Sequence, residues 1–332
     1  MKLLLISDGR PGHVHQSDGI LAAIRKMSQP EVYRAHLEKR SWPPRRIRTA
    51  ILASKNMRQI LPTATSLKLA GLDVGSIPFK PDIIISTGGA CLGASVMAAQ
   101  VFNAVNIHSG STRGFSDSDF SVVLHLNPSF SDRSNYIIGL KPSAIQPIPR
   151  AADQKSGLAL LIGAPTSSHP FSKAEWSALV SWLEKTEFQL EILSSPRTPL
   201  AWTNDLLRVS SSNSARIMFR NFQSEGVGGV AEALASSMGV MVTADSNSMI
   251  AEAVAAQVPV VSLEPSSYGK VPDVEYNQLL RSNGWVETLK IEIISDEQIA
   301  KKIATCTPMT ENHLDTLVKN LREKLPQLFG SL

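Results

Sequence analysis

The sequence predicts an α/β protein built from two doubly wound domains, and three observations support this fold class. First, 332 residues fit two domains of ordinary size. Second, short apolar runs alternate with helix-like segments, which is typical of parallel strands buried on both faces. Third, the alternation of strand-like and helix-like segments stops at 146–157, a stretch that is Pro-rich and then polar, and it resumes after residue 157. We therefore expect an N-terminal domain over 1–150 and a C-terminal domain over 151–332.

The apolar runs of the first half predict six strands and two helices. The strands are expected at 3–7, 31–36, 82–86, 104–108, 120–124 and 136–138, and the helices at 16–26 and 91–102. The second half repeats the pattern. Its strands are expected at 158–162, 188–193, 215–219, 240–243 and 259–263, and its helices at 173–185, 199–209, 229–236, 248–257 and 274–282. The tail over 310–329 has apolar and charged residues at helical spacing, so a last helix is expected there.

The composition excludes several classes of protein. With 43% hydrophobic and 19% charged residues, the chain is neither disordered, nor collagen-like, nor a coiled coil. Its two cysteines cannot build a disulfide framework or a four-cysteine zinc site, and no metal site is expected. The uncharged stretch over 83–107 contains Ser, Thr, Gly, Gln and Asn. A strand, a turn and a buried helix explain that stretch better than a membrane span.

Charge is distributed unevenly along the chain. Residues 1–150 contain 18 Lys and Arg but only 9 Asp and Glu, whereas the second half is acidic. The surplus is concentrated at 39–48, Lys-Arg-Ser-Trp-Pro-Pro-Arg-Arg-Ile-Arg. A basic half suggests an anionic partner, such as a membrane surface, a phosphorylated acceptor or nucleic acid. An ordinary solvated loop is the alternative. We expect a cytoplasmic protein, with a peripheral position on the inner membrane face as one option.

In open α/β sheets ligands bind beyond the carboxyl ends of the strands, so the turns after the strands are the places to search. Two such turns belong to the N-terminal half. The first runs from Asp8 to Ser17 and holds Gly9, Gly12, His13 and Gln16. Glycines allow a ligand to approach the backbone, and His13 or Asp8 is a candidate general base. The second turn holds Thr87, Gly88 and Gly89, which suit a phosphate or a sugar edge; close packing of helix on strand is the alternative.

Two turns of the C-terminal half carry groups suited to a diphosphate. Gly163 and Ser167 follow the first strand, in a turn that also contains His169. Ser195, Arg197 and Thr198 follow the next strand and open a helix, where a cation beside a helix N-terminus is suited to an anion. The alternatives are a solvated loop with helix-capping serines and a surface arginine.

The turn from Asp245 to Glu252 carries the strongest signal. Asp245, Ser246, Asn247 and Ser248 end a strand and cap a helix, and Glu252 lies one turn further along the same helix face. A carboxylate there can accept both hydroxyls of a ribose while the turn above it holds phosphates. The alternative is a capped helix start with an exposed glutamate.

Two weaker patterns point to other chemistry. Residues 226–231 fit G-x-G-x-x-A, and Asp245 follows at a strand end, close to a dinucleotide fingerprint. However, residues 220–225 separate these glycines from the preceding strand, where the motif requires a direct turn. Asp117 and Asp119 match the D-x-D of metal-dependent sugar transferases, but a solvated turn explains so short a match better.

Three of these turns together resemble the mitochondrial-fission (elongated mitochondria) family. They are Asp8–His13 with Gln16 and Ser17, Ser195–Pro199, and above all Asp245–Ala253. The likeness is to bacterial-type members, which are often mislabelled as nucleoside-diphosphate-sugar epimerases. It extends from about residue 5 to about residue 290. The family is similar in architecture to GT-B glycosyltransferases, two Rossmann-like domains facing a cleft, such as the lipid II-forming N-acetylglucosaminyltransferase and lipid A disaccharide synthase.

The resemblance implies a function and a role for each turn. Glu252 would hold the ribose of a nucleotide-sugar, and Ser246, Asn247 and Ser248 would face its diphosphate near Arg197. The N-terminal domain would meet a lipid-linked or envelope glycan acceptor, with His13 or Asp8 as the base. The tail over 310–329 would cross back toward the N-terminal domain. No cofactor is required beyond the donor, and no nucleic acid is expected.

Two further hypotheses stay open at the level of the sequence. The plant branch of the family recruits fission machinery, so the chain could be a non-catalytic adaptor at a membrane. The glycines at 226–231 and Asp245 leave a NAD-dependent nucleotide-sugar enzyme as the third hypothesis. The nucleobase, the sugar, the acceptor and the oligomeric state are not specified by the sequence.

Overall fold

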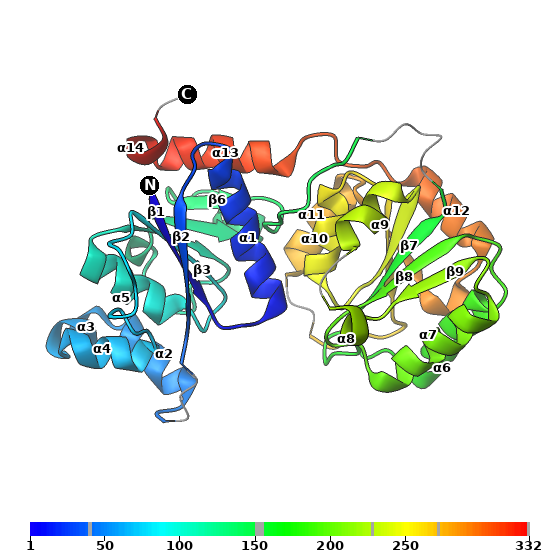
Figure 1. The fold of residues 1–332 in the computed structure, drawn as a ribbon, viewed down its shortest axis with the longest axis horizontal. Coiled ribbons are helices and arrows are strands. Elements are labelled where there is room, and N and C mark those ends of the chain that lie inside the picture. Colours follow the sequence, from blue (N-terminus) through cyan, green and yellow to red (C-terminus); the bar gives the residue numbers. More distant parts are fainter. Residues whose placement is uncertain (39–41, 150–155, 227–228, 271–272, 331–332) are drawn as a thin grey trace. The chain divides into compact units, whose positions relative to one another are not determined.

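A computed structural model describes residues 1–38, 42–149, 156–226, 229–270 and 273–330. The chain divides into two compact units (Figure 1). The N-terminal unit consists of Met1–Ala144 together with His313–Leu332, and the C-terminal unit is Ile145–Asn312. The C-terminal tail therefore belongs to the N-terminal unit. Parts of three expected features lie outside the described residues: 39–41 of the basic stretch, 150–155 of the linker and 227–228 of the glycine-rich stretch.

The N-terminal unit contains a six-stranded parallel sheet in the order β2-β1-β3-β4-β5-β6. The strands are β1 (Lys2–Ser7), β2 (Glu31–His36), β3 (Ile83–Thr87), β4 (Val105–Ser109), β5 (Val122–His125) and β6 (Tyr136–Ile138). Because β2 lies on one side of β1 and β3 on the other, the strand order reverses between β1 and β3. This reversal is the topological switch point, where open α/β sheets bind ligands.

Helices cover both faces of this sheet: α1 (Pro11–Arg25), α2 (Arg45–Ala53), α3 (Lys55–Ile60), α4 (Thr63–Ala70) and α5 (Leu92–Phe102). The first helix begins at Pro11 and not near Gln16, because proline is favoured at the first helical position. His13 and Gln16 therefore lie on the helix and not in the preceding turn. No helix was predicted over α2, α3 and α4, because their basic residues and the flanking prolines obscure their short apolar faces.

The C-terminal tail forms α13 (His313–Lys324) and α14 (Pro326–Phe329), where one helix over 310–329 was expected. The helix ends before Pro326, which cannot continue its hydrogen bonds. Leu314, Leu317 and Leu321 of α13 are buried in the same core as strand β1 and helix α1. The ring of His313 also hydrogen-bonds through Nε2 to the carbonyl oxygen of Ser143 at 2.8 Å. The tail thus completes the core of the N-terminal unit.

The C-terminal unit contains a second six-stranded parallel sheet, in the order β12-β11-β10-β7-β8-β9. Its strands are β7 (Leu158–Ile162), β8 (Leu190–Ser194), β9 (Ile217–Arg220), β10 (Gly239–Thr243), β11 (Val260–Glu264) and β12 (Val286–Lys290). Its helices are α6 (Lys173–Leu183), α7 (Leu200–Ser212), α8 (Phe222–Glu225), α9 (Val230–Ser236), α10 (Asn247–Ala255), α11 (Val274–Ser282) and α12 (Asp296–Thr305). The strand order reverses between β7 and β10, which is the switch point of this unit.

The predicted fold class is confirmed: both sheets are parallel and are flanked by helices. Strand β12 and helix α12 were not predicted, because Val-Glu-Thr-Leu-Lys at the sheet edge lacks the continuous apolar run of a central strand. Among the residues that the structure describes, no helix is both long and apolar enough to cross a membrane.

Candidate functional site

The turns that follow β7 and β10 meet at the switch point of the C-terminal unit. The carboxylate of Asp245, after β10, is fully buried and accepts a hydrogen bond from the backbone N–H of Ala164 at 3.1 Å. The N–H of Gly163 donates to Oγ1 of Thr243 at 2.8 Å. A Cβ at position 163 would lie 2.3 Å from the Asp245 carboxylate. Only glycine lets the two turns approach this closely.

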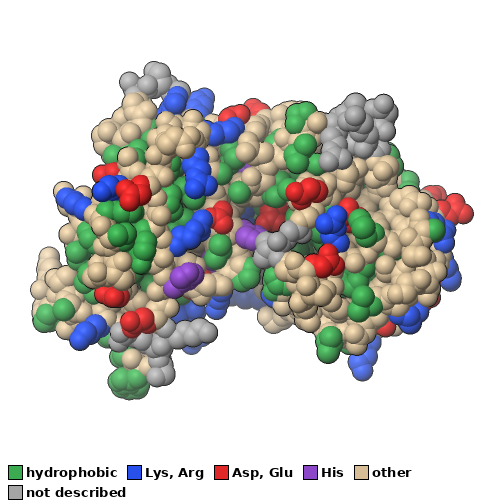
Figure 2. Space-filling view, in the orientation of Figure 1, with side chains coloured by type: hydrophobic (Ala, Val, Ile, Leu, Met, Phe, Trp, Pro, Cys, Tyr) green, Lys and Arg blue, Asp and Glu red, His purple; other side chains and the backbone are tan. Residues whose placement is uncertain are grey.

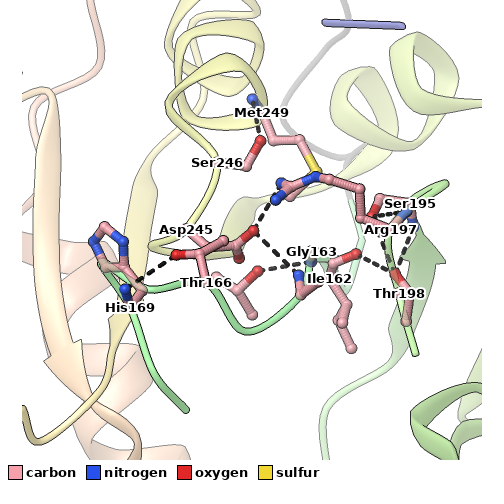
Figure 3. A network of polar contacts seen from close by, with 12 residues as sticks. Ile162, Gly163, Thr166, His169, Ser195, Arg197, Thr198, Asp245, Ser246 and Met249 are labelled. Atoms are coloured by element: carbon pink, nitrogen blue, oxygen red, sulfur yellow. Dashed lines mark hydrogen bonds and ion pairs between the residues drawn. The ribbon is translucent and has the colours of Figure 1, made fainter. Parts of the chain in front are cut away.

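Arg197, from the turn after β8, completes this arrangement (Figure 3). Its Nη2 lies 2.7 Å from Oδ2 of Asp245, while the arginine side chain as a whole stays 48% exposed. Oδ1 of Asp245 is buried and has no hydrogen-bond partner among the described residues. The buried carboxylate therefore holds a guanidinium group at the carboxyl edge of the sheet, with most of its donors left over.

The turn that carries Arg197 is fixed by its own hydroxyls. The N–H of Ser195 donates to Oγ1 of Thr198 at 2.8 Å, and that hydroxyl donates to the carbonyl of Ile162 at 2.9 Å. The N–H of Arg197 donates to Oγ of Ser195 at 3.2 Å. Ser195 and Thr198 are buried and thus position the arginine without presenting their own side chains to solvent.

The N-terminus of helix α10 lies beside this ion pair (Figure 3). Ser246 caps the helix and accepts the N–H of Met249 at 3.4 Å. Asn247 and Ser248 are half-buried in the first turn, where backbone N–H groups attract anions. Glu252 lies further along α10 and is only 8% exposed. Ser167, in contrast, is exposed in the loop after β7.

A pocket of about 230 Å³ opens next to the start of α10. Asn247 and Ile250 of α10 line one side, and the other walls come from the loops after β7 and β10 and from β11, the loop after it, α11 and β12. The polar side chains of these other walls are His169, Ser262, Glu264, Tyr268, Asn277, Gln278 and Arg281. The pocket thus combines an apolar floor with convergent polar groups, the usual composition of a small-molecule site.

One wall of this pocket is a hydrogen-bonded group centred on Glu264. Its carboxylate accepts Arg281 Nη2 at 2.8 Å and Ser262 Oγ at 3.0 Å, and it also accepts the hydroxyl of Tyr268. Burial, followed by the hydrogen bond to Glu264, raises the pKa of Tyr268. The ring of His169 packs edge-on against Tyr268, and burial lowers the pKa of this histidine. The wall therefore keeps a neutral tyrosine and a neutral histidine at neutral pH.

The switch point of the N-terminal unit holds an Asp–His pair. Nδ1 of His13, in the first turn of α1, lies 3.0 Å from both carboxylate oxygens of Asp8. A carboxylate can only accept, so Nδ1 carries the proton and Nε2 of the neutral ring remains an acceptor. Asp8 is nearly buried, whereas the His13 side chain is partly exposed. This arrangement orients a histidine as a general base.

Two glycines in the turn after β3 leave room for the imidazole of His13 and the guanidinium of Arg113. A Cβ at Gly88 would lie 2.2 Å from Cε1 of His13, and a Cβ at Gly89 would lie 2.6 Å from Nε of Arg113. The imidazole and the guanidinium thus lie over the turn that follows β3. Arg113 adopts a left-handed backbone with φ of 46°, a conformation uncommon outside glycine and often found at functional sites.

Gln16 and Thr87, which were expected in an acceptor site, are buried and hydrogen-bonded within the N-terminal unit. Ser17 and Thr87 share a hydrogen bond of 2.8 Å between their hydroxyls. Gln16 donates to the carbonyl of Gly12 at 2.8 Å and accepts the hydroxyl of Ser109 at 3.1 Å. These four side chains are buried, so they anchor α1 to strands β3 and β4. Gly9 has a φ of +77° and makes the tight turn before the helix.

Two buried groups complete the surroundings of His13. His108 of β4 bonds through Nδ1 to Ser86, and its buried Nε2 has no partner among the described residues. Burial, with smaller effects of the His13 and Arg113 charges, lowers the pKa of His108 to about 3. Burial and the charge of Asp8 raise the pKa of Cys91 to about 12, so this thiol is not a nucleophile at neutral pH. His13, with a partly exposed ring and Nε2 left as an acceptor, is therefore the group beside this turn whose geometry fits a general base.

The sequence located the turns but missed several of their partners. Arg113, Glu264, Tyr268 and Arg281 were not singled out, although Glu264 and Tyr268 follow a predicted strand in the position searched elsewhere. No pattern in the sequence pairs Arg197 with Asp245, which are 48 residues apart. Among the described residues, no group of His, Cys, Asp and Glu is arranged to hold a metal ion.

Comparison with solved structures shows the same two-domain fold in other proteins. MurG of Acinetobacter baumannii is 16% identical with a TM-score of 0.53, over 96% of this chain and 92% of that one. The UDP-GlcNAc 2-epimerase of Neisseria meningitidis, solved with UDP-GlcNAc, is 13% identical with a TM-score of 0.58, over 98% and 100%. S. aureus MnaA, solved with UDP, is 11% identical with a TM-score of 0.59, over 98% and 96%. No curated protein sequence matches the chain.

These likenesses define the class of fold: it is the GT-B fold, which glycosyltransferases and nucleotide-sugar epimerases share. The model of the mitochondrial fission ELM1 family matches residues 142–315, just over half of the chain. The chain therefore belongs to the mitochondrial fission ELM1 family, as the turn motifs predicted.

Proposed function

We propose that the protein transfers a sugar from a nucleotide-sugar donor to a glycan acceptor. The observation that carries this proposal is the arrangement at the switch point of the C-terminal unit. There a buried Asp245 holds the guanidinium of Arg197 next to the N-terminus of α10. Fixed positive charge at a strand edge and a helix N-terminus suits a diphosphate.

The donor would occupy the C-terminal unit. In the proposal, Arg197 and the first N–H groups of α10 bind the diphosphate, and the hydroxyl-bearing turns at Ser167 and Ser248 surround it. Glu252 binds the hydroxyls of the ribose. Because little of Glu252 is exposed, ribose binding requires a small shift of α10. The uncharged remainder of the donor enters the pocket of about 230 Å³ beside Asn247. The nucleotide ligands of MnaA and of the Neisseria epimerase support this class of donor for the shared fold.

The acceptor would occupy the N-terminal unit at His13. Nε2 of His13 removes the proton of an acceptor hydroxyl, and the oxygen then forms a bond to the anomeric carbon of the donor. The bond from that carbon to the diphosphate breaks, and Arg197 with the α10 N-terminus neutralises the departing charge. Positive charge from the protein makes a metal ion unnecessary in this scheme. Transfer also requires the two units to bring their ligands together.

We further propose that the acceptor is lipid-linked or part of the cell envelope and is met at an anionic membrane surface. The support is the charge of residues 1–150, with 18 Lys and Arg against 9 Asp and Glu. Such a surplus attracts anionic surfaces through unspecific electrostatics.

Donor binding is tested by thermal stabilisation of the purified protein against UDP, GDP, CMP, dTDP, ADP and NAD(H). A ligand at about 100 times its dissociation constant should stabilise the fold by about 2.7 kcal/mol. The proposal predicts stabilisation by a nucleoside diphosphate that is lost in Glu252→Ala. Glu232→Ala, an exposed glutamate of α9, is the control that keeps the response. No response to any nucleotide would contradict the proposal.

Membership of the fission family supports a second candidate, a non-catalytic adaptor at a membrane. It predicts that Glu252→Ala leaves the cellular role intact. No observation favours the NAD-dependent alternative. Helix α8 (Phe222–Glu225) separates the glycines from β9, and Asp245, which that hypothesis assigns to a ribose, is buried against Arg197.

A further inference from the structure

The segment between β2 and β3 has a charge pattern found nowhere else in the chain. From residue 39 to residue 72 the sequence contains eight Lys and Arg and no Asp or Glu. Its described part forms helices α2, α3 and α4, which pack on one another and on α5 (Figure 1). We call residues 42–60, the part holding α2 and α3, the basic excursion.

The basic excursion is scarcely buried. Helix α2 buries only Leu52, and in α3 only the side chain of Arg58 is buried. Three large apolar side chains are instead turned to solvent: Trp42 is 78% exposed, Ile60 74% and Ile47 49%. Trp42 and Ile60 are the most exposed large hydrophobic side chains of the described residues. A folded domain has no packing reason to expose a tryptophan and two isoleucines in one short segment.

The cations of the excursion fall into two sets. Arg58 is buried against Asp119, Arg48 donates to the carbonyl of Leu69, and Lys55 donates to the hydroxyl of Ser118, so these three hold the helices to the unit. Arg45 and Arg46, in the first turn of α2, are exposed and have no hydrogen bond or ion pair with any described residue. Two cations at a helix N-terminus are also unfavourable for the helix itself. The position of these two arginines lowers the stability of α2. An anionic partner would offset this loss.

Figure 2 shows this end of the N-terminal unit in space-filling form. Hydrophobic side chains project from its lower end, and Lys and Arg side chains stand close to them. Asp and Glu side chains are visible at this end too, as elsewhere on this face.

We propose that the basic excursion binds the surface of an anionic lipid bilayer. Trp42, Ile47 and Ile60 enter the headgroup region, while Arg45 and Arg46 bind the lipid phosphates. Tryptophan prefers the membrane interface, and clusters of Lys and Arg bind anionic headgroups. Isoleucines have no π-face for stacking on nucleobases, which favours lipid over RNA. The inference supplies the membrane contact that the proposed function assumes, but it does not depend on nucleotide binding.

The test is co-sedimentation of the full-length protein with vesicles of phosphatidylcholine, with and without phosphatidylglycerol. We expect binding to the anionic vesicles only. Arg45→Glu combined with Arg46→Glu should weaken it about 27-fold, from about 1 kcal/mol per basic residue lost and tenfold per 1.4 kcal/mol. Lys173→Glu with Lys301→Glu reverses the same amount of charge on exposed residues of the C-terminal unit and should change binding much less. If both double variants lost the same amount of vesicle binding, net charge alone would explain the binding, and the proposal would be overturned.

Trp42 supplies an internal reporter of insertion. The other four tryptophans are buried or half-buried, so brominated anionic lipids should quench mainly Trp42. Quenching should disappear in Trp42→Phe, a variant that keeps the ring and should keep most of the binding. Binding without quenching of Trp42, or binding to a homopolymer RNA but not to vesicles, would overturn the proposal. Nucleotide-induced stabilisation of the Arg45/Arg46 variant shows separately whether the donor site is intact.

Discussion

The two units share one architecture but use it for different chemistry. In each unit a carboxylate follows a strand at the switch point and is held at the start of a helix. Asp8 pairs with His13, an imidazole whose Nε2 remains free to accept a proton. Asp245 pairs with Arg197, a cation that cannot be deprotonated. In the proposed function, the partner of the carboxylate therefore distinguishes the proton-transfer site from the anion-binding site.

The glycines at the two switch points also differ in the group for which they leave space. Gly88 makes room for the imidazole of His13, and Gly163 makes room for the carboxylate of Asp245. In the N-terminal unit the open space serves the reactive ring itself. In the C-terminal unit it serves the group that positions Arg197. One site thus presents its base directly, and the other presents its cation through a buried support.

His13→Ala is expected to have the largest effect. Removing a general base should lower turnover of a nucleotide-sugar by about 10²–10⁴-fold. Affinity for the nucleoside diphosphate should stay within twofold, because His13 belongs to the N-terminal unit. The measurement is release of nucleoside diphosphate, alongside a binding titration. If His13→Ala also lost affinity for the nucleotide, proton transfer and nucleotide binding would not belong to separate sites.

Arg197→Ala should mainly weaken nucleotide binding. Loss of a charge-assisted hydrogen bond and of the neighbouring positive charge should raise the dissociation constant by about 10–100-fold, or 1.5–3 kcal/mol. Arg208→Ala, which removes an exposed arginine of α7 paired with Glu184, serves as the control and should bind normally. Unchanged affinity in Arg197→Ala would leave the buried Asp245 pair with a purely structural role.

Gly163→Ala tests the contact between the two turns of the C-terminal unit. The new Cβ would meet the Asp245 carboxylate at 2.3 Å, so the fold should lose about 1–3 kcal/mol of its free energy of unfolding. Gly139→Ala is the matched control in the N-terminal unit, since a Cβ there meets nothing within 4 Å. Urea unfolding of the two variants measures the difference. Equal stability would mean that the turns separate without cost.

Glu175 supplies a buried carboxylate with only a structural role. It accepts hydrogen bonds from Ser172 and Ser266, which outweigh the effect of burial and lower its pKa to about 2. A depressed pKa means that the unfolded chain binds more protons, so this stabilisation is complete above about pH 4.5 and disappears as pH falls toward 2. Glu175→Gln should therefore lower the free energy of unfolding by about 1–3 kcal/mol at pH 7. The difference in stability between wild type and variant should become smaller as pH falls from about 4.5 toward 2. A difference independent of pH would assign the loss to packing.

The sequence predicted the fold class and most strands because buried parallel strands are continuous apolar runs. It also predicted the turns that hold Asp8, Gly88, Gly163 and Asp245, since these turns follow the strands directly. It did not predict α2 and α3, whose interaction with the unit rests on a few contacts and not on an apolar stripe. It could not pair Arg197 with Asp245, because that contact depends on the order of strands in the sheet.

Calorimetric titration of a stabilising nucleoside diphosphate into wild-type protein, His13→Ala and Arg197→Ala tests the central claim most directly. The claim is that the anion site of the C-terminal unit binds the donor independently of the base in the N-terminal unit. It predicts equal dissociation constants for wild type and His13→Ala, and a constant at least tenfold larger for Arg197→Ala. Equal binding by all three proteins, or equal weakening in both variants, would contradict it.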